Sequence, residues 1–467
     1  MHHATFTESF RRIHDLAAFA ELPVSPQVTR AGVDNLSRLG TTGLARREAT
    51  GTVAHPRDAQ ITVIGGGAVG AAAAYFLARA GYTDIQLLDK QGLCEATSSQ
   101  AAGMVGQARP TVDRARLTMA AAEFYRGFER ETGYPMDYRE SGAVRIALSD
   151  TSVAELEQIA ATAAVTGLPV EFLSDAQLRE VFPPLQRTDG IRAALWSPTC
   201  GYVQPNSLVA AYASAARDLG VTVAPHAAVT GIGTRRGQVC SVSTRDGEFA
   251  TEQVIIAAGP WSVALAALAG VDLPIIPVLH EYFVTEPVPG WHAGLPCLRI
   301  PEIGVYARGE GERVLCGGFE NQGTSLDPRG VTVGGPLPAS PDWDVLGGFA
   351  EGLGRFVPGL PGTGVSTTFR GWPTFTPDGR FLVGPVSAVR GLAFAAGCNA
   401  HGVSGSAGLA RYLVESLGPD PSPYVRSLSP DRYLPRTWTW EDAERQARAV
   451  YETYYPMPAP PGPAVPA

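Results

Sequence analysis

The sequence predicts an α/β fold (α+β overall) with a nucleotide-binding unit and a second, largely antiparallel unit, for three reasons. At 61–82 a β-branched run ends in glycines and leads into a helix of small residues, which is the pattern of a βαβ nucleotide-binding unit. A second glycine-rich junction between a strand and a helix lies much later, at 391–417. Between them, residues 275–320 form alternating short strands, which is typical of an antiparallel sheet.

Length and composition narrow the class of protein. The 467 residues are enough for two or three packed units. A formal net charge of -8 argues against a nucleic-acid-binding surface. The six cysteines form no CxxC pair and no cluster with histidine, so we expect reduced thiols and no metal site. No apolar run reaches the roughly 18 residues of a membrane span, and we expect a cytoplasmic protein with no membrane partner.

The first elements in the chain form the nucleotide-binding pattern. Residues 1–57 read as an N-terminal extension of mixed character, a surface arm or oligomer contact. "ITVIGGG" (61–67) predicts a strand, "AVGAAAAYFLARAGY" (68–82) a helix, and "DIQLLDK" (84–90) a second buried strand. Three consecutive elements of this kind predict a parallel sheet with a helix packed on it.

The later elements follow from periodicity and from turn residues. We expect Asn206 or Ser207 to cap the N-terminus of a helix that ends at Gly220. The last ten residues are proline-rich, and we expect them to be disordered. The other expected elements are helices at 111–131, 151–167, 205–220 and 341–356, and strands at 141–148, 221–232 and 247–261.

These elements suggest a division of the chain into interleaved domains. We predict a nucleotide-binding domain made of discontinuous segments, 58–148, 197–270 and 365–420. The substrate-binding domain takes 149–196 and 271–364. Residues 421–467 form a C-terminal extension.

The glycine pattern at the first strand is a dinucleotide fingerprint. Gly65 permits the tight turn, Gly67 lets the backbone approach a pyrophosphate, and Gly70 lets helix and strand pack closely. Asp89 ends the next strand, where a carboxylate can accept hydrogen bonds from a ribose 2′-hydroxyl. An acid there favours FAD or NAD over NADP. The neighbours Ala68, Val69 and Lys90 complete this part of the expected cofactor site.

The second glycine-rich junction distinguishes FAD from NAD. "AAGCNAHGVSGSAG" (395–408) predicts a second helix N-terminus with free amides. Such a site suits the polar edge of an isoalloxazine, which gains electron density on reduction, whereas a nicotinamide needs no second site.

A series of motifs carries a family resemblance. "VIGGGAVGAAAAYFLARAGYTDIQLLDK", "ATSSQAAGM", "SPTCGYVQPNSLVAAYA", "VIIAAGPWS", "HEYFVTEP", "VYARGEGERVLCGGFE", "FTPDGRFLVGP" and "AAGCNAHGVSGSAG" occur in this order. Together they resemble the D-amino-acid oxidase superfamily of flavoproteins, and most of all the flavin-dependent half of dimethylglycine and sarcosine dehydrogenases. The resemblance covers roughly residues 58–455.

The resemblance implies a Rossmann-like FAD-binding domain, a mixed substrate domain and an oxidoreductase activity. The expected reaction is oxidation of the C–H bond next to nitrogen in an amine or amino acid, with hydride passing to flavin N5 and the imine then hydrolysed. For an N-methylated substrate this is an N-demethylation, with dioxygen or an electron carrier as the acceptor. D-amino-acid or hydroxy-acid oxidation, a non-catalytic flavin-binding subunit and homo-oligomer formation stay open.

The same motifs assign further residues to the FAD site. They are Ser98, Ser99, Gln100, Ala102, Gly103, Val229, Ala258, Gly259, Trp261, Gly397, Asn399, His401, Gly402, Val403 and Ser404.

Two positions bear on how the flavin is attached. Gln100 stands where the dimethylglycine and sarcosine dehydrogenases have a histidine bonded to the flavin, and glutamine has no nucleophilic ring nitrogen. Gly371 stands where monomeric sarcosine oxidases have a flavin-linked cysteine. We therefore expect non-covalent FAD, with the nearby thiol of Cys398 as the alternative. Lys90 is the only lysine and lies beside Asp89, so a lysine over the flavin that assists reaction with oxygen is not expected.

The candidate catalytic residues lie on two strands and a turn. His280 and Tyr282 alternate on "LHEYFV", so both point to one face, where they could accept a proton and orient the substrate. Tyr306 and Arg308 alternate on "VYARGE", and an arginine there could bind a substrate carboxylate. His401, at the expected flavin edge, could stabilise the reduced flavin.

Arg308 has competitors for the carboxylate role. In glycine and D-amino-acid oxidases the carboxylate arginine follows the tyrosine by four residues, but that position here is Glu310. Arg370 and Arg145 are the alternatives, and a surface ion pair is the non-functional interpretation of Arg308.

Overall fold

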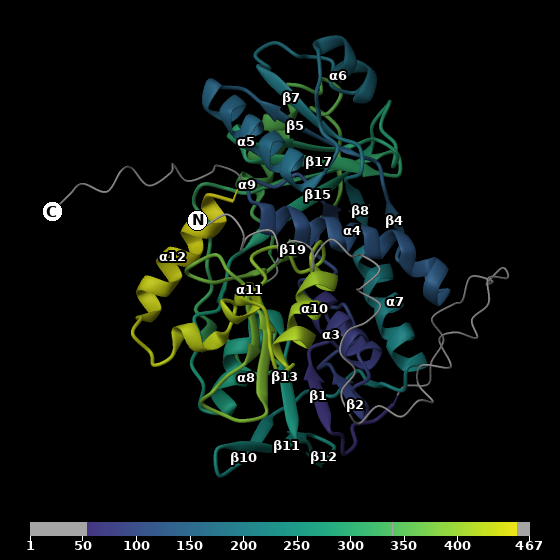
Figure 1. Cartoon of the computed structure of the whole chain (residues 1–467). Coiled ribbons are helices and arrows are strands. Elements are labelled where there is room, and N and C mark those ends of the chain that lie inside the picture. Colours follow the sequence, from purple (N-terminus) through teal and green to yellow (C-terminus); the bar gives the residue numbers. More distant parts are fainter. Residues whose placement is uncertain (1–53, 339, 455–467) are drawn as a thin grey trace, which may run out of the picture.

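The computed structural model describes residues 54–338 and 340–454, and two large sheets organise this part of the chain (Figure 1). The predicted N-terminal extension up to residue 53 and the proline-rich tail lie outside the described residues. The two sheets confirm the predicted fold class, a sheet with helices packed on it and a separate, mostly antiparallel sheet.

The first sheet is the nucleotide-binding sheet. It has six strands in the order β21-β22-β13-β1-β2-β9, which come from three distant parts of the chain. Only β21 runs antiparallel to its neighbour. The strands are β1 (Ile61–Ile64), β2 (Ile85–Leu88), β9 (Thr222–Ala224), β13 (Gln253–Ile256), β21 (Leu382–Pro385) and β22 (Leu392–Ala396).

Helices α3 (Ala68–Arg79), α7 (Pro205–Asp218) and α10 (Ser406–Ser416) pack together beside this sheet, and α4 (Val112–Thr132) contacts α10 (Figure 1). Their shared core is largely alanine and aromatic. The small residues of α3 are almost fully buried, which lets the helices approach the sheet closely. This packing fixes the N-terminus of α3 above the end of β1.

The second sheet has eight strands in the order β19-β15-β18-β17-β16-β5-β7-β6. One pair, β16 with β5, is parallel and the other pairs are antiparallel. The strands are β5 (Ala143–Ala147), β6 (Glu171–Phe172), β7 (Ala193–Ser197), β15 (His280–Pro287), β16 (Cys297–Ile300), β17 (Val305–Glu310), β18 (Arg313–Gly318) and β19 (Val365–Gly371). Strand β5 belongs to this sheet although it lies in segment 58–148, which the sequence assigns to the nucleotide-binding domain.

Smaller elements complete the fold. Three short sheets join β3 (Met104–Val105), β8 (Gly201–Val203) and β4 (Tyr138–Arg139); β10 (Gly231–Arg235), β11 (Gln238–Thr244) and β12 (Gly247–Ala250); and β14 (Ile276–Pro277) with β20 (Thr374–Phe375). The other helices are α5 (Asp150–Thr166), α6 (Asp175–Val181), α8 (Ser262–Leu268), α9 (Trp343–Gly354), α11 (Pro423–Arg426) and α12 (Trp440–Glu452).

Some local predictions are wrong. The strands expected at 221–232 and 247–261 are each interrupted, since β9 ends at Ala224 before β10 begins, and β12 ends at Ala250 before β13 begins.

Neither Asn206 nor Ser207 caps α7, because Pro205 occupies the first helical position and Gln204 is the N-cap residue. Proline is well suited to that position, since its fixed φ is helical and its missing N–H would have no helical partner. The helix therefore begins one residue before the first candidate cap.

Candidate active site

A deep cavity runs from the fingerprint turn to the face of the eight-stranded sheet. Its empty volume is about 1720 Å³, and this volume includes space that is open to solvent. Its lining comes from both sheets, from the 96–103 loop and from Tyr454, two residues after α12. A cavity of this volume, which joins a nucleotide-binding turn to a second sheet, has room for a dinucleotide and a small substrate together.

The fingerprint turn has the close contacts that its glycines predict. Gly65 has φ +111, and a Cβ there would lie 2.5 Å from the Ala257 carbonyl oxygen. A Cβ on Gly70 would lie 1.8 Å from the Gly65 carbonyl oxygen. Neither position can accept a side chain, and this leaves the backbone open toward the cavity.

Asp89 lies at the end of β2 and lines the cavity. Its carboxylate accepts hydrogen bonds from the backbone N–H groups of Gly66 at 2.6 Å and Gln91 at 2.8 Å. Burial raises the pKa of Asp89, although these amide bonds act in the opposite direction. The side chain thus fixes the fingerprint turn and keeps lone pairs for a ribose hydroxyl.

The 96–103 loop is attached to both domains. Ser98 Oγ accepts a hydrogen bond from Ala68 N at the start of α3, at 3.0 Å. Gln100 Oε1 accepts one from Arg370 N at 3.1 Å. A Cβ on Gly371 would lie 3.3 Å from the Gln100 Cβ, so the two positions discussed for flavin attachment are in contact. Neither of them carries a group that could bond covalently to a flavin.

Tyr282 and Arg308 support this loop from the substrate side and do not line the cavity. The Tyr282 hydroxyl donates to the Ala101 carbonyl at 3.4 Å, and Arg308 Nε donates to the Ala102 carbonyl at 2.8 Å. Arg308 Nη1 also donates to the Glu310 carboxylate at 2.6 Å. These contacts occupy Nε and Nη1 of Arg308, so part of its guanidinium group has structural partners within the chain.

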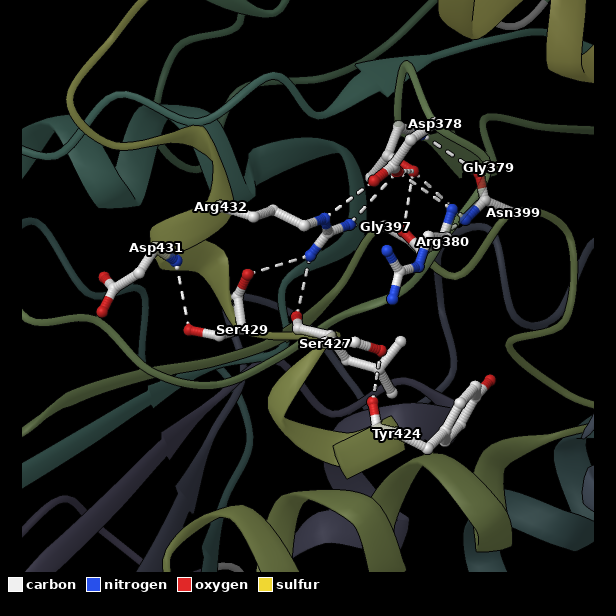
Figure 2. Close-up of polar contacts among 12 residues, drawn as sticks. Asp378, Gly379, Arg380, Gly397, Asn399, Tyr424, Ser427, Ser429, Asp431 and Arg432 are labelled. Carbon is white, nitrogen blue, oxygen red and sulfur yellow. Dashed lines mark hydrogen bonds and ion pairs between the residues drawn. The ribbon is translucent and has the colours of Figure 1, made fainter. Parts of the chain in front are cut away.

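The second glycine-rich turn is held by a polar network (Figure 2). Asn399 has φ 45, and its side chain donates to the Gly397 carbonyl at 2.7 Å and accepts from Thr376 N at 3.1 Å. Thr376 Oγ1 bonds Asp378, which forms an ion pair with Arg432 at 2.8 Å. This network holds the start of the turn, and Gly402, Val403 and Ser404, which follow in the chain, line the cavity.

His401 lies within this turn, buried behind the lining. Its Nδ1–H donates to the Asn399 carbonyl at 2.6 Å, which leaves Nε2 as an acceptor. Among the described residues this buried Nε2 has no hydrogen-bond partner. Burial and the nearby charges of Arg109 and Arg114 hold its pKa well below the usual value, so the ring is neutral.

His280 on β15 and Tyr306 on β17 line the cavity from two strands of the second sheet that lie on either side of β18. His280 Nε2 lies 2.9 Å from the Tyr306 hydroxyl, and Nδ1 lies 3.4 Å from the hydroxyl of Tyr451 on α12. Burial lowers the pKa of His280 to about 4. The pair therefore presents a neutral imidazole and a phenol to the substrate end of the cavity.

Four functional candidates escaped the sequence-based predictions: Arg109, Arg299, Phe319 and Tyr454 all line the cavity. A Cβ on Gly106 would lie 3.5 Å from Arg299 Nη2 and 3.9 Å from Arg109 Nη2, so both guanidinium groups approach one point. Arg109 is almost fully buried. Neither arginine belongs to a sequence motif. The two lie 190 residues apart in the chain, so no local sequence pattern indicates that they come together.

A strap of chain, residues 331–338, crosses the nucleotide end. Val333 and Gly334 line the cavity. Lys90 Nζ donates to the Gly335 carbonyl at 3.0 Å and lies 3.7 Å from the centroid of a Trp261 ring. Trp261 Nε1 donates to the same carbonyl at 3.0 Å. Both side chains were predicted at the cofactor site, and here they also hold the strap.

Most residues predicted at the cofactor site line the cavity. The lining includes Gly65, Gly67, Ala68, Val69, Asp89, Lys90, Ser98, Gln100, Ala102, Gly103, Val229, Ala258, Gly259, Trp261, Gly402, Val403 and Ser404. The others, Gly70, Ser99, Gly397, Asn399 and His401, do not line the cavity, but each is next in sequence to a residue that does. Of the carboxylate alternatives, Arg370 contributes its backbone N–H to Gln100, and Arg145 lies on β5.

The lining fits FAD. The fingerprint offers the close backbone approach that a pyrophosphate needs, and the unpartnered Nε2 of His401 leaves one polar atom near the second turn. Within the described ranges, no group of histidine, cysteine, aspartate and glutamate could hold a metal ion. The same residues contain no helix long and apolar enough to cross a membrane.

Comparisons with known proteins place the chain among flavin-dependent proteins. The model of the "FAD dependent oxidoreductase" (DAO) family matches residues 60–416. The 4-methylaminobutanoate oxidase (formaldehyde-forming) of Paenarthrobacter nicotinovorans is 30% identical over 360 residues, which cover 77% of this chain and 44% of that protein. Mitochondrial dimethylglycine dehydrogenase of Rattus norvegicus is 30% identical over 403 residues, or 84% of this chain and 47% of that protein.

The chain thus spans about half the length of these curated relatives. Among solved structures, L-proline dehydrogenase from P. horikoshii has a similar fold, with a TM-score of 0.73 and 21% identity. The similarity covers 81% of this chain and 98% of that one.

Proposed function

This chain belongs to the FAD-dependent oxidoreductase (DAO) family, and from that premise we propose that it oxidises the C–H bond next to nitrogen in an N-methylated amino acid. FAD is its cofactor. When bound, FAD supplies the acceptor for the two electrons of that bond. The observation that carries the substrate proposal is the wall of the cavity beyond the two glycine-rich turns, where aromatic rings and two arginines meet.

The aromatic part of this wall suits a methylated nitrogen. His280 lies 4.5 Å from Phe319 between ring centroids, and Phe319 stacks on Tyr454 at 4.0 Å with an interplanar angle of 5°. Tyr306 stacks on His280 at 5.7 Å. Aromatic faces attract methylated ammonium groups, and their apolar surface matches N-methyl carbons. A primary amine would leave part of this surface without contact.

The arginine part of the wall suits a carboxylate. Almost fully buried Arg109 and half-buried Arg299 converge over Gly106, and their like charges repel each other. A substrate carboxylate between them offsets this repulsion and accepts charge-assisted hydrogen bonds from both. We therefore assign carboxylate binding to Arg109 and Arg299 in place of Arg308.

The remaining residues position the substrate for oxidation. A neutral His280 adds no positive charge beside a nitrogen whose lone pair must stay available. Tyr306 can orient the amine by a hydrogen bond, since His280 holds its hydroxyl at 2.9 Å. An N-methyl substrate oxidised at its methyl group yields formaldehyde and the demethylated amine after hydrolysis of the imine.

The experiment is an anaerobic bleaching screen with purified FAD-loaded protein. The compound classes are N-methyl amino acids, the matched N-methylamines without a carboxylate, primary D-amino acids and hydroxy acids. We expect N-methyl amino acids to bleach the flavin absorbance at the lowest concentrations. Faster bleaching by D-amino or hydroxy acids would refute the substrate proposal, and no bleaching by any amine would refute amine oxidation.

A further inference from the structure

Tyr454, two residues after the end of α12, lines the cavity at the end that we assign to the substrate. Tyr454 stacks on Phe319 and lies 5.8 Å from His401 between ring centroids. Helix α12 is seen at the edge of the molecule in Figure 1, and it packs on the core through Ala443, Ala447 and Tyr451. The C-terminal helix therefore delivers a phenol to the wall that we assign to the substrate.

The charged and titratable groups around this phenol are mostly cationic. Arg109 hydrogen-bonds its hydroxyl, and Arg299 and Arg114 add their charges. His401, on the other side, is neutral. Burial acts to raise the pKa of Tyr454, but the three arginines outweigh it and lower the pKa below its usual value.

No carboxylate lies among the described residues that line this end of the cavity. The acidic side chains of the described lining are Asp89 and Glu95, which are neighbours in the fingerprint region at the nucleotide end. Among the described residues that line this end, Tyr454 is thus the group beside Arg109 that becomes an anion when it loses its proton.

We propose that Tyr454 accepts the proton of the substrate's ammonium nitrogen, and that binding of the substrate carboxylate at Arg109 drives the transfer. This inference rests on the proposed function, because it needs a substrate that carries both groups. In the transfer the N–H bond breaks, the O–H bond of Tyr454 forms, and the electron pair of the N–H bond remains on nitrogen. Oxidation of the adjacent C–H bond requires that free pair.

Carboxylate binding and proton transfer are coupled because Tyr454 and the substrate carboxylate both accept hydrogen bonds from Arg109. Without substrate, the guanidinium group hydrogen-bonds the Tyr454 oxygen and favours its phenolate form, which lowers the pKa of Tyr454. A bound carboxylate takes those hydrogen bonds and partly neutralises the arginine pair. The phenolate then becomes a stronger base at the moment an ammonium group arrives beside it. The alternative acceptor, His280, is a weaker base, since its pKa lies near 4 and tyrosine hydroxyls contact both ring nitrogens.

The first test measures protons and needs no turnover. Acetate supplies a carboxylate without an amine, so its binding to the FAD-loaded protein at mildly alkaline pH should draw a proton from solvent onto Tyr454. We expect an uptake of up to about one proton per bound acetate, read from a pH indicator in weak buffer. Y454F should bind acetate without this uptake. Y134F, which alters a tyrosine that bonds Asp218 outside the cavity, should retain it.

Equal proton uptake by the wild type and Y454F, or none by a wild type saturated with acetate, would overturn the proposal. The second test is the anaerobic rate of flavin reduction by an N-methyl amino acid. Y454F should lower this rate about a hundredfold at neutral pH, with recovery as the pH approaches the substrate's own ammonium pKa.

The two failures are distinguishable. An unchanged rate and pH profile in Y454F would remove Tyr454 from the mechanism and leave amine oxidation standing. A wild type whose flavin is not reduced by any amine would refute the proposed function instead.

Discussion

Replacement of Arg308 by methionine separates a structural role from substrate binding. The guanidinium group donates to the carbonyls of Ala102, at 2.8 Å, and Gly309, at 3.0 Å, and its side chain is 2% exposed. Each hydrogen bond from a charged group contributes about 1.5–3 kcal/mol. The ion pair with Glu310, whose side chain is 36% exposed, adds at most about 1 kcal/mol. Methionine retains most of the apolar volume, so R308M should destabilise the fold by roughly 3–6 kcal/mol.

Part of this loss should appear as weaker cofactor binding, because Ala102 belongs to the loop that lines the cavity. If only the loss of the hydrogen bond to Ala102 weakens FAD binding, its cost of about 1.5–3 kcal/mol corresponds to a roughly ten- to hundredfold higher Kd for FAD. The measurements are urea unfolding of the apoprotein and titration of FAD by flavin fluorescence. The affinity of the loaded protein for acetate should stay unchanged.

Glu310→Gln is the matched control, since it removes the exposed partner and keeps the bond to Ala102. It should cost about 1 kcal/mol or less. The reasoning is refuted if R308M leaves stability and FAD affinity intact but abolishes acetate binding. Arg308 would then bind the substrate carboxylate, as one interpretation of the sequence has it, and the assignment to Arg109 and Arg299 would be wrong.

Three further predictions address the cofactor and the histidine. Acid precipitation should release FAD into the supernatant, because Gln100 and Gly371 offer no linking atom; colour retained in the pellet would contradict non-covalent binding. Lys90→Met should speed FAD dissociation roughly tenfold by loss of the bonds to the strap, and an unchanged rate in a chase with excess apoprotein acceptor would show that the strap does not retain the cofactor. The pKa of His280 is about 4 in the native protein and near 6.5 unfolded, so the unfolded state binds more protons as the pH falls from 6.5 toward 4. The free energy of unfolding should therefore drop by up to about 3 kcal/mol over that range, and H280N should remove this part of the pH dependence.

The nucleotide-binding half of the site could be predicted from local sequence motifs. The spacing of Gly65, Gly67 and Gly70 is set by contacts within a single strand, turn and helix, so the pattern is complete in the sequence. The second turn at 397–404 was recognisable for the same reason. Its supporting network through Asp378 and Arg432 was not predicted, because it joins segments that meet only in the folded chain (Figure 2).

The substrate half depends on long-range packing and was predicted less well. Alternation placed Tyr306 and Arg308 on one face of β17, yet only the tyrosine reaches the cavity. Arg308 is diverted to the loop carbonyl of Ala102, and periodicity cannot reveal such a partner. Tyr454 was hidden for a related reason, since nothing near it in sequence indicates that α12 returns to the second sheet.

The most direct test of amine oxidation is a single anaerobic turnover of the FAD-loaded protein with an N-methyl amino acid. The flavin absorbance and the products are measured in the same sample. The proposed function predicts that bleaching is matched by equal amounts of formaldehyde and demethylated amino acid. Saturating N-methyl amino acid that leaves the flavin oxidised and yields no formaldehyde would contradict it.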